Sequence, residues 1–170
     1  LGMEMASLAD NTALRKELRG LGVAVFVVKT VREQMRYDTQ RIVVEKGKPF
    51  EIIWDNADVM PHNLVVVDNG KHMDIATLTM TMPPDKKDRQ GRAYLPDPKT
   101  LNFHAATKLI EAGDKEKIEI KGLNKEGEYE YVCTFPGHAV LMWGKIIVTK
   151  DVDAYLQANP NFLLPAPGVK

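Results

Sequence analysis

The feature that most constrains this fold is a series of short β-rich runs separated by turn-forming residues. In the run 116–121, Ile118 and Ile120 alternate with charged residues, which is typical of a strand with one buried and one exposed face. Turns are expected around Gly47 and Gly70. Many short strands of this kind indicate a two-sheet β-sandwich or a barrel. Seven strands are expected, at residues 23–31, 41–45, 50–55, 62–67, 116–121, 128–133 and 144–149.

A long insertion at about 68–113 interrupts the strand pattern. A structureless loop of that length is unusual, so we expect helical turns and an eighth strand within 101–110. Further helices are expected at 7–20 and 152–158. The first residue is Leu, as in an excised fragment. The expected organisation is an N-terminal helix or linker (1–20), a β-sandwich domain (21–150) and a C-terminal extension (151–170).

Composition excludes several classes of function. The chain has 170 residues, with 23 Lys and Arg against 23 Asp and Glu, so no overall charge attracts it to nucleic acid or to an anionic membrane. The longest apolar run, 21–28, is far shorter than the roughly 20 residues that cross a bilayer. Cys133 is the only cysteine, which excludes an internal disulfide, a CxxC motif and an iron–sulfur cluster held by this chain alone.

The most informative stretch is the segment YVCTFPGHAVLM. It supplies a thiolate from Cys133, an imidazole from His138 and a thioether from Met142 within one short loop. A second imidazole is available from His62, at the start of another apolar run. Two imidazoles and one thiolate with a weak axial thioether are the donor set of an electron-transfer copper site.

These motifs resemble those of the cupredoxins, the small blue copper proteins, and are most like azurin and auracyanin. The resemblance lies in the segment 133–138, in Met142 and in the pair His62–Asn63. It implies an all-β, cupredoxin-like, eight-stranded Greek-key β-sandwich with an N-terminal helix and a long, partly helical insertion. It also implies one type 1 copper ion, with His62, Cys133 and His138 as equatorial ligands and Met142 as the axial ligand.

The resemblance also implies roles for the residues around the ligands. The Asn63 side chain would tie the ligand loops together beside Thr134, and the amides of Asn63 and Phe135 would donate to the cysteine sulfur. Pro61 stands where azurin-like proteins have glycine, which favours a four-coordinate site without a carbonyl contact. Trp143 is expected either to shield the copper or to pack in the core. The edge of His138 would serve as the electron port, within an apolar docking patch formed by Met60, Pro61, Pro136, Gly137 and Ala139.

The expected function is therefore electron transfer by a blue copper protein or domain that is not itself an enzyme. The resemblance implies redox partners such as c-type cytochromes, a dehydrogenase or an oxidase, and a periplasmic or other extracytoplasmic location. Two alternatives are a copper storage or delivery domain and the electron-entry domain of a larger bacterial oxidoreductase.

Other interpretations of single residues compete with this one. Cys133 and His138 could form a nucleophile pair, zinc could occupy the same donors, or Cys133 could be a buried structural thiol. His72 and His104 are expected in surface or packing roles, with a second metal site as the alternative. Met73, Met80 and Met82 are expected to fill packing gaps, with a copper-collecting cluster as the alternative.

Overall fold

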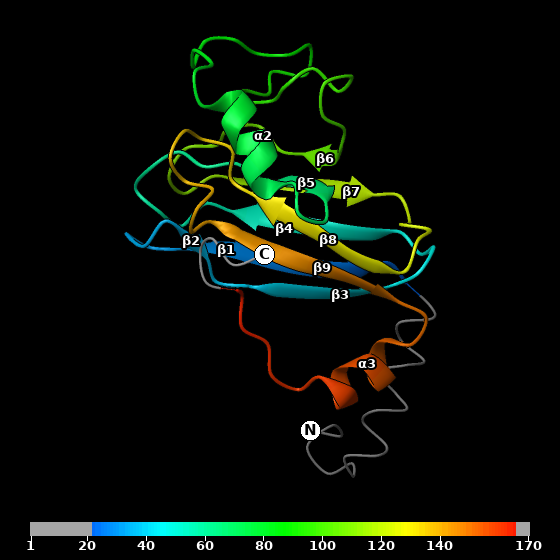
Figure 1. Ribbon diagram of the computed structural model, residues 1–170. Coiled ribbons are helices and arrows are strands. Elements are labelled where there is room, and N and C mark those ends of the chain that lie inside the picture. Colours follow the sequence, from blue (N-terminus) through cyan, green and yellow to red (C-terminus); the bar gives the residue numbers. More distant parts are fainter. Residues whose placement is uncertain (1–21, 166–170) are drawn as a thin grey trace.

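Two β-sheets pack face to face to form the molecule, and a helix-containing insertion covers one of them (Figure 1). The computed structural model describes residues 22–165, so the helix expected at 7–20 lies outside the described residues. The all-β sandwich predicted from the sequence is confirmed. The strands are β1 (Ala24–Val31), β2 (Arg36–Tyr37), β3 (Arg41–Glu45), β4 (Phe50–Asp55), β5 (Val65–Asp68), β6 (Phe103–Ala106), β7 (Lys115–Ile120), β8 (Gly127–Val132) and β9 (Trp143–Thr149).

The strand order places strands side by side that are distant in the chain. One sheet has the order β2-β1-β4-β7 and the other has the order β3-β9-β8-β5-β6. β1 runs parallel to β4, and β3 runs parallel to β9, whereas β8 is antiparallel to both β5 and β9. Connections of the Greek-key type are needed for this order, because β3 and β4 follow each other in the chain but lie in different sheets, where they pair with the distant strands β9 and β1.

The main hydrophobic core fills the space between the sheets. Trp54 of β4 and Tyr131 of β8 are fully buried there, and their rings both contact Tyr37 of β2. β2 is the strand that the sequence pattern did not predict. It has only two residues and pairs with the end of β1, where Thr30 faces Tyr37.

A second, smaller core lies on the other face of the second sheet. Helix α2 (His72–Thr79) belongs to the insertion and buries Ile75 and Ala76 against this face. β5 therefore has buried side chains on both faces: Val66 belongs to the main core, and Val65 and Val67 belong to the second one. This double burial explains why β5 is a continuous apolar run rather than an alternating one.

The remaining elements of the insertion and the tail also follow the sequence pattern. β6 (Phe103–Ala106) lies within the interval in which an eighth strand was expected. Helix α3 (Val152–Ala158) has the expected bounds, and the Asp151 carboxylate caps it by accepting from the Ala154 N–H at 3.0 Å. Among the described residues, no helix combines the length and the apolar character that crossing a membrane requires.

Candidate metal centre

Cys133, His138 and Met142 lie on the loop that joins β8 to β9. The Cys133 N–H donates to the Met142 carbonyl at 3.0 Å, and the Met142 N–H donates to the His138 carbonyl at 2.9 Å. The His138 N–H in turn donates to the Phe135 carbonyl at 3.0 Å. Gly137 has a φ of 88°, in the left-handed region that glycine adopts without the steric cost of a side chain. The loop is therefore held in shape by its own backbone.

His62 approaches from the loop between β4 and β5. Its N–H donates to the Ile110 carbonyl at 3.2 Å, and its carbonyl accepts from the Ile110 N–H at 3.0 Å. This isolated bridge fixes the backbone of His62 three residues before β5 begins. The strand expected at 62–67 therefore begins later, at Val65.

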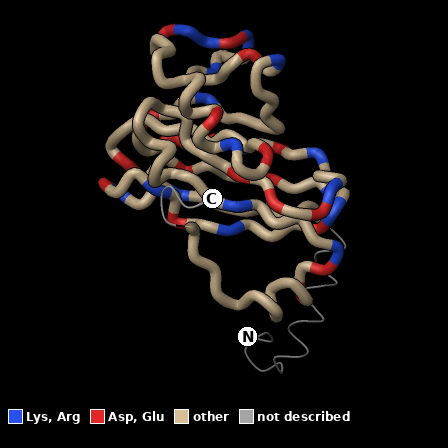
Figure 2. Tube along the Cα trace, in the orientation of Figure 1, with Lys and Arg blue, Asp and Glu red and all other residues tan. Residues whose placement is uncertain are grey.

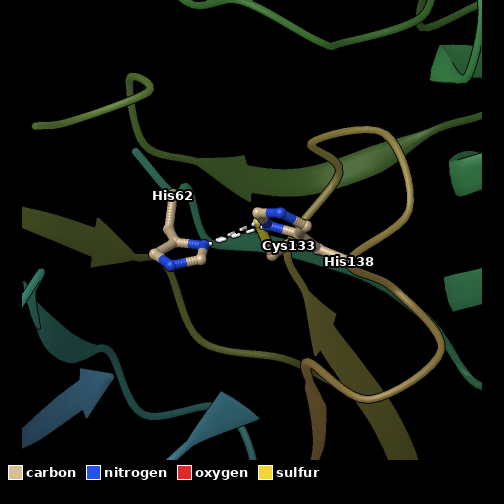
Figure 3. A group of neighbouring side chains, drawn as sticks. All are labelled: His62, Cys133 and His138. Atoms are coloured by element: carbon tan, nitrogen blue, oxygen red, sulfur yellow. Dashed lines mark hydrogen bonds between the residues drawn. The ribbon is translucent and has the colours of Figure 1, made fainter. Parts of the chain in front are cut away.

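The side chains of His62, Cys133 and His138 point toward one another (Figure 3). The two Nδ1 atoms lie 3.0 Å apart, and the Cys133 Sγ lies 3.5 Å from Nδ1 of His138 and 3.8 Å from Nδ1 of His62. All three residues are buried, and their donor atoms lie within 4.8 Å of one another. The fold thus gathers two imidazole nitrogens and one sulfur, from loops 71 residues apart in the chain, in one enclosed space.

Met142 is the fourth residue that the sequence predicts as a ligand. It is fully buried and belongs to the same core cluster as Cys133. Its carbonyl accepts from the Cys133 N–H, so the two sulfur-containing residues are neighbours across the base of the loop.

Asn63 links the two loops that carry the candidate ligands. Its Oδ1 accepts from the Thr134 N–H, and its Nδ2 donates to the Thr134 Oγ1, both at 2.8 Å. The Thr134 hydroxyl donates to the Tyr94 carbonyl at 2.6 Å, and the Tyr37 hydroxyl donates to the Asn63 carbonyl at 2.6 Å. This buried network holds the residue after His62 against the residue after Cys133.

The surroundings of the Cys133 sulfur set its protonation. Burial raises the pKa of the thiol to about 12, and the backbone N–H groups of Asn63 and Phe135, which face the sulfur, oppose that rise. A thiol that is neutral at pH 7 and shielded from solvent is a poor nucleophile. This disfavours the Cys133–His138 nucleophile pair, and the two N–H donors suit a sulfur that becomes a thiolate by binding a metal.

The two imidazoles have different surroundings. Burial, and then the neighbouring His62, lower the pKa of His138 to about 4, so this ring is neutral at pH 7 and offers a nitrogen lone pair. His62 is fully buried, and its Nε2 lies 2.7 Å from Oδ2 of Asp58.

The Asp58–His62 pair is the feature of the site that the sequence analysis missed. Asp58 is only 3% exposed. Burial by itself would raise the pKa of its carboxyl group, but hydrogen bonds from the Glu33 N–H and the His62 ring bring that pKa below its usual value. The sequence does show an acidic residue, Asp58, four positions before the candidate ligand His62. This spacing is common in proteins, so it does not by itself predict a contact.

The predicted docking patch needs one correction. Ala139 is only 3% exposed and packs in the second core with Val132 and Trp143, so it does not lie on the surface. Val140 and Leu141, the residues that follow it, are exposed instead. In the patch as the structure has it, Pro61 and Pro136 are half-buried, and the exposed members are Val59, Met60, Gly137, Val140 and Leu141.

The other candidate residues have partners outside this centre. His72 Nδ1 lies 3.0 Å from Oε1 of Glu130, and its ring stacks on Trp143 with centroids 3.9 Å apart. His104 Nε2 lies 2.7 Å from Oδ1 of Asp68. Met73 and Met80 are exposed on and beside α2. The part of the chain that the structure describes therefore has a single group of metal-ligating side chains of this kind, His62, Cys133 and His138.

The donor set itself identifies the metal that fits. Thiolate sulfur stabilises Cu(I), imidazole nitrogen accommodates Cu(II), and an enclosed site with both kinds of donor can hold either state. A trigonal arrangement of two imidazoles and a thiolate is the pattern of copper electron-transfer sites rather than of four-coordinate structural zinc sites.

Comparison with known proteins agrees with this chemistry. An azurin from Pseudomonas fluorescens biotype C is 30% identical over 122 residues, which cover 67% of this chain and 90% of the azurin. Auracyanin-A from Chloroflexus aurantiacus is 29% identical over 133 residues, which cover 76% of each chain. The solved structure of auracyanin A, described as a "blue" copper protein from that bacterium, matches with a TM-score of 0.65 at 26% identity and covers 75% of this chain and all of its own.

The family model for copper-binding proteins of the plastocyanin/azurin family matches residues 24–149. This range contains the whole sandwich, and with it His62, Cys133 and His138. The chain therefore belongs to the plastocyanin/azurin family, the cupredoxins, and its cofactor is one copper ion.

Proposed function

We propose that this protein carries single electrons between redox partners by means of a type 1 copper site. His62, Cys133 and His138 are the equatorial ligands in this proposal, and Met142 is the axial ligand. The observation that carries the proposal is the convergence of the three equatorial donor atoms within 4.8 Å in a buried space. When bound, the copper ion supplies a one-electron change between Cu(I) and Cu(II).

The chain contributes rigidity to this function. The hydrogen bonds within the β8–β9 loop and the Asn63–Thr134 link hold the ligand loops at fixed positions. Side chains fixed in this way change position little when the charge of the site changes by one, which favours fast electron transfer. The N–H groups of Asn63 and Phe135 stabilise negative charge on the Cys133 sulfur, and burial excludes water.

We place the electron port at His138, which lies beside the exposed apolar residues of the patch. Val59 and Met60 lie on the loop of His62, and Val140 and Leu141 lie on the loop of His138. A small apolar patch suits brief docking with a partner. Residues of both charge signs are interspersed over the molecule, which agrees with docking that does not depend on an overall field (Figure 2).

The cellular location and the redox partners are inferred from the relatives. We infer an extracytoplasmic location, and partners among c-type cytochromes, dehydrogenases or oxidases, from the similarity to azurin and auracyanin. In this proposal residues 21–150 form the electron-transfer unit, with residues 1–20 before it and residues 151–170 after it. The unit itself catalyses no reaction, including in the case where it is the entry domain of a larger oxidoreductase.

Copper loading of the purified protein tests this proposal. Addition of Cu(II) should give an intense blue colour and a narrow copper hyperfine splitting in electron paramagnetic resonance. The substitution Cys133→Ser should abolish the colour, because the thiolate is lost. A colourless or ordinary tetragonal spectrum of the wild-type protein would refute a type 1 site.

A pair of methionine variants separates the axial ligand from a copper-collecting cluster. Met142→Leu should keep the colour and raise the reduction potential, because a weak donor to Cu(II) is lost. Met73→Leu is the matched control, since Met73 is exposed on α2, and it should leave the potential unchanged.

Retention of copper separates electron transfer from copper storage or delivery. An electron carrier should keep its copper through repeated redox cycles, whereas a storage or delivery domain would lose copper readily to a chelator.

A further inference from the structure

The ring of His62 is held at both nitrogens. Nδ1 faces the Cys133 sulfur and the His138 ring, and Nε2 meets the carboxylate of Asp58 at 2.7 Å. The side chains of this pair are 0% and 1% exposed. Solvent therefore does not weaken the contact, and a hydrogen bond between a buried imidazole and a carboxylate is strong.

The carboxylate of Asp58 is itself fixed by the backbone. Its Oδ1 accepts from the Glu33 N–H at 3.0 Å and from the Val59 N–H at 2.8 Å, while Oδ2 faces His62. The Asp58 N–H donates to Oδ1 of Asn56 at 3.1 Å. Both oxygens are thus engaged as acceptors, which favours an ionised group that cannot rotate away from the ring.

This arrangement has two consequences for the ring. If the Nε2–H of His62 donates a hydrogen bond to the Asp58 carboxylate, then the free lone pair of the ring lies on Nδ1, the nitrogen that faces the other ligands. In addition, a fixed negative charge beside a ligand ring stabilises the more positive state of a bound ion. A carboxylate behind a ligand histidine has both effects at metal sites in general.

We propose that Asp58 is a positioning residue of the copper site, which orients His62 with Nδ1 toward the metal and lowers the reduction potential by stabilising Cu(II) over Cu(I). The inference rests on the proposed function, because it assumes that His62 is a ligand. It adds a residue outside the four ligands and assigns the two imidazoles unequal roles.

The substitution Asp58→Asn tests the inference with the least change in shape. The amide has no charge and only one acceptor oxygen, so it cannot accept both from the backbone N–H groups and from the ring. We expect the equilibrium to shift toward Cu(I) by about tenfold or more, which corresponds to a rise in reduction potential of about 59 mV or more for one electron. The potential is measured by redox titration of the blue absorption band.

Asp68→Asn is the matched control. Asp68 also contacts a histidine ring nitrogen at 2.7 Å, that of His104, but this pair is largely exposed and lies outside the metal centre. The variant removes the same charge and the same kind of hydrogen bond, so it should leave the potential unchanged. An equal shift in both variants would attribute the effect to net charge and would overturn the proposal.

The outcomes distinguish this inference from the function on which it rests. A wild-type protein that does not turn blue would refute the proposed function. A blue wild-type protein whose potential is unchanged by Asp58→Asn would overturn the role of Asp58 and leave the function intact.

A second measurement does not depend on the folding of the variant. In the Cu(I)-loaded wild-type protein, the Hε2 proton of His62 should resonate well downfield of the Hε2 proton of His138, because it is shared with a carboxylate. Equal chemical shifts for the two protons would overturn the proposal.

Discussion

The Cys133 sulfur must lose its proton before it can bind copper. Burial raises the pKa of this thiol to about 12, so the thiol of the metal-free protein is protonated at pH 7. His138, with a pKa of about 4, is already neutral at pH 7 and can bind a metal without releasing a proton. Loading with Cu(II) at pH 7 should therefore release about one proton per ion from the thiol. A pH indicator in weakly buffered solution measures the release.

The control for this prediction is Cys133→Ser, which has no thiol proton to release. If the variant released as many protons as the wild-type protein, the source would be another group. If the wild-type protein released none, the thiol would already be ionised in the metal-free state.

At the residue scale, the candidate ligands could be predicted from the sequence, but their partners could not. Cys133, His138 and Met142 share one loop, so their spacing is a local signal. The bond between Asp58 and His62 depends on how the backbone turns between them, and Asp58 is fixed in part by Glu33, which is 25 residues away in the chain. The family resemblance implies that Ala139 belongs to the docking patch, and only the fold shows that it packs in the second core.

At the scale of elements, strands with strong alternation were predictable to within a residue or so. β7 has isoleucines at alternating positions, and in β4 the buried residues Phe50, Ile52 and Trp54 alternate with less buried ones, so the bounds of both strands follow the pattern. β2 could not be predicted, because two residues carry no periodicity and the strand exists only through its pairing with β1. β5 begins later than expected, because the apolar pattern does not show that His62 pairs with Ile110 outside the strand.

The link between the two ligand loops leads to a prediction about stability. The substitution Asn63→Ala removes both hydrogen bonds to Thr134 and leaves the buried Thr134 N–H without that acceptor. An unsatisfied buried donor costs about 1–3 kcal/mol, so the free energy of unfolding of the metal-free protein should fall by about that amount. Urea denaturation followed by circular dichroism measures it.

Asn69→Ala serves as the control for this substitution. Its Oδ1 accepts from Lys145 Nζ at 2.7 Å in an exposed contact, so its loss should cost less than about 0.5 kcal/mol. Similar losses in the two variants would mean that the link between the loops has no special importance for the fold.

At the scale of the whole molecule, burial of ionisable groups in the core couples folding to pH. The unfolded chain binds a proton at His138 below a pH of about 6.5, whereas the folded chain does so only below about 4. Between these values the unfolded state holds more protons, so acidification favours unfolding. The pKa values of Asp58 and Glu130 are also lower in the folded state, which extends the loss of stability to lower pH.

The metal-free protein should therefore lose about 3 kcal/mol of unfolding free energy between pH 6.5 and pH 4 through His138. Urea denaturation at several pH values, with a chelator present, measures this slope. His138→Gln should flatten the slope in that interval, whereas His104→Gln, at a more exposed histidine, should preserve it. A wild-type protein with constant stability from pH 6.5 to pH 4 would show that His138 can take up a proton in the folded state, and a buried, neutral imidazole would then be the wrong description of this ligand.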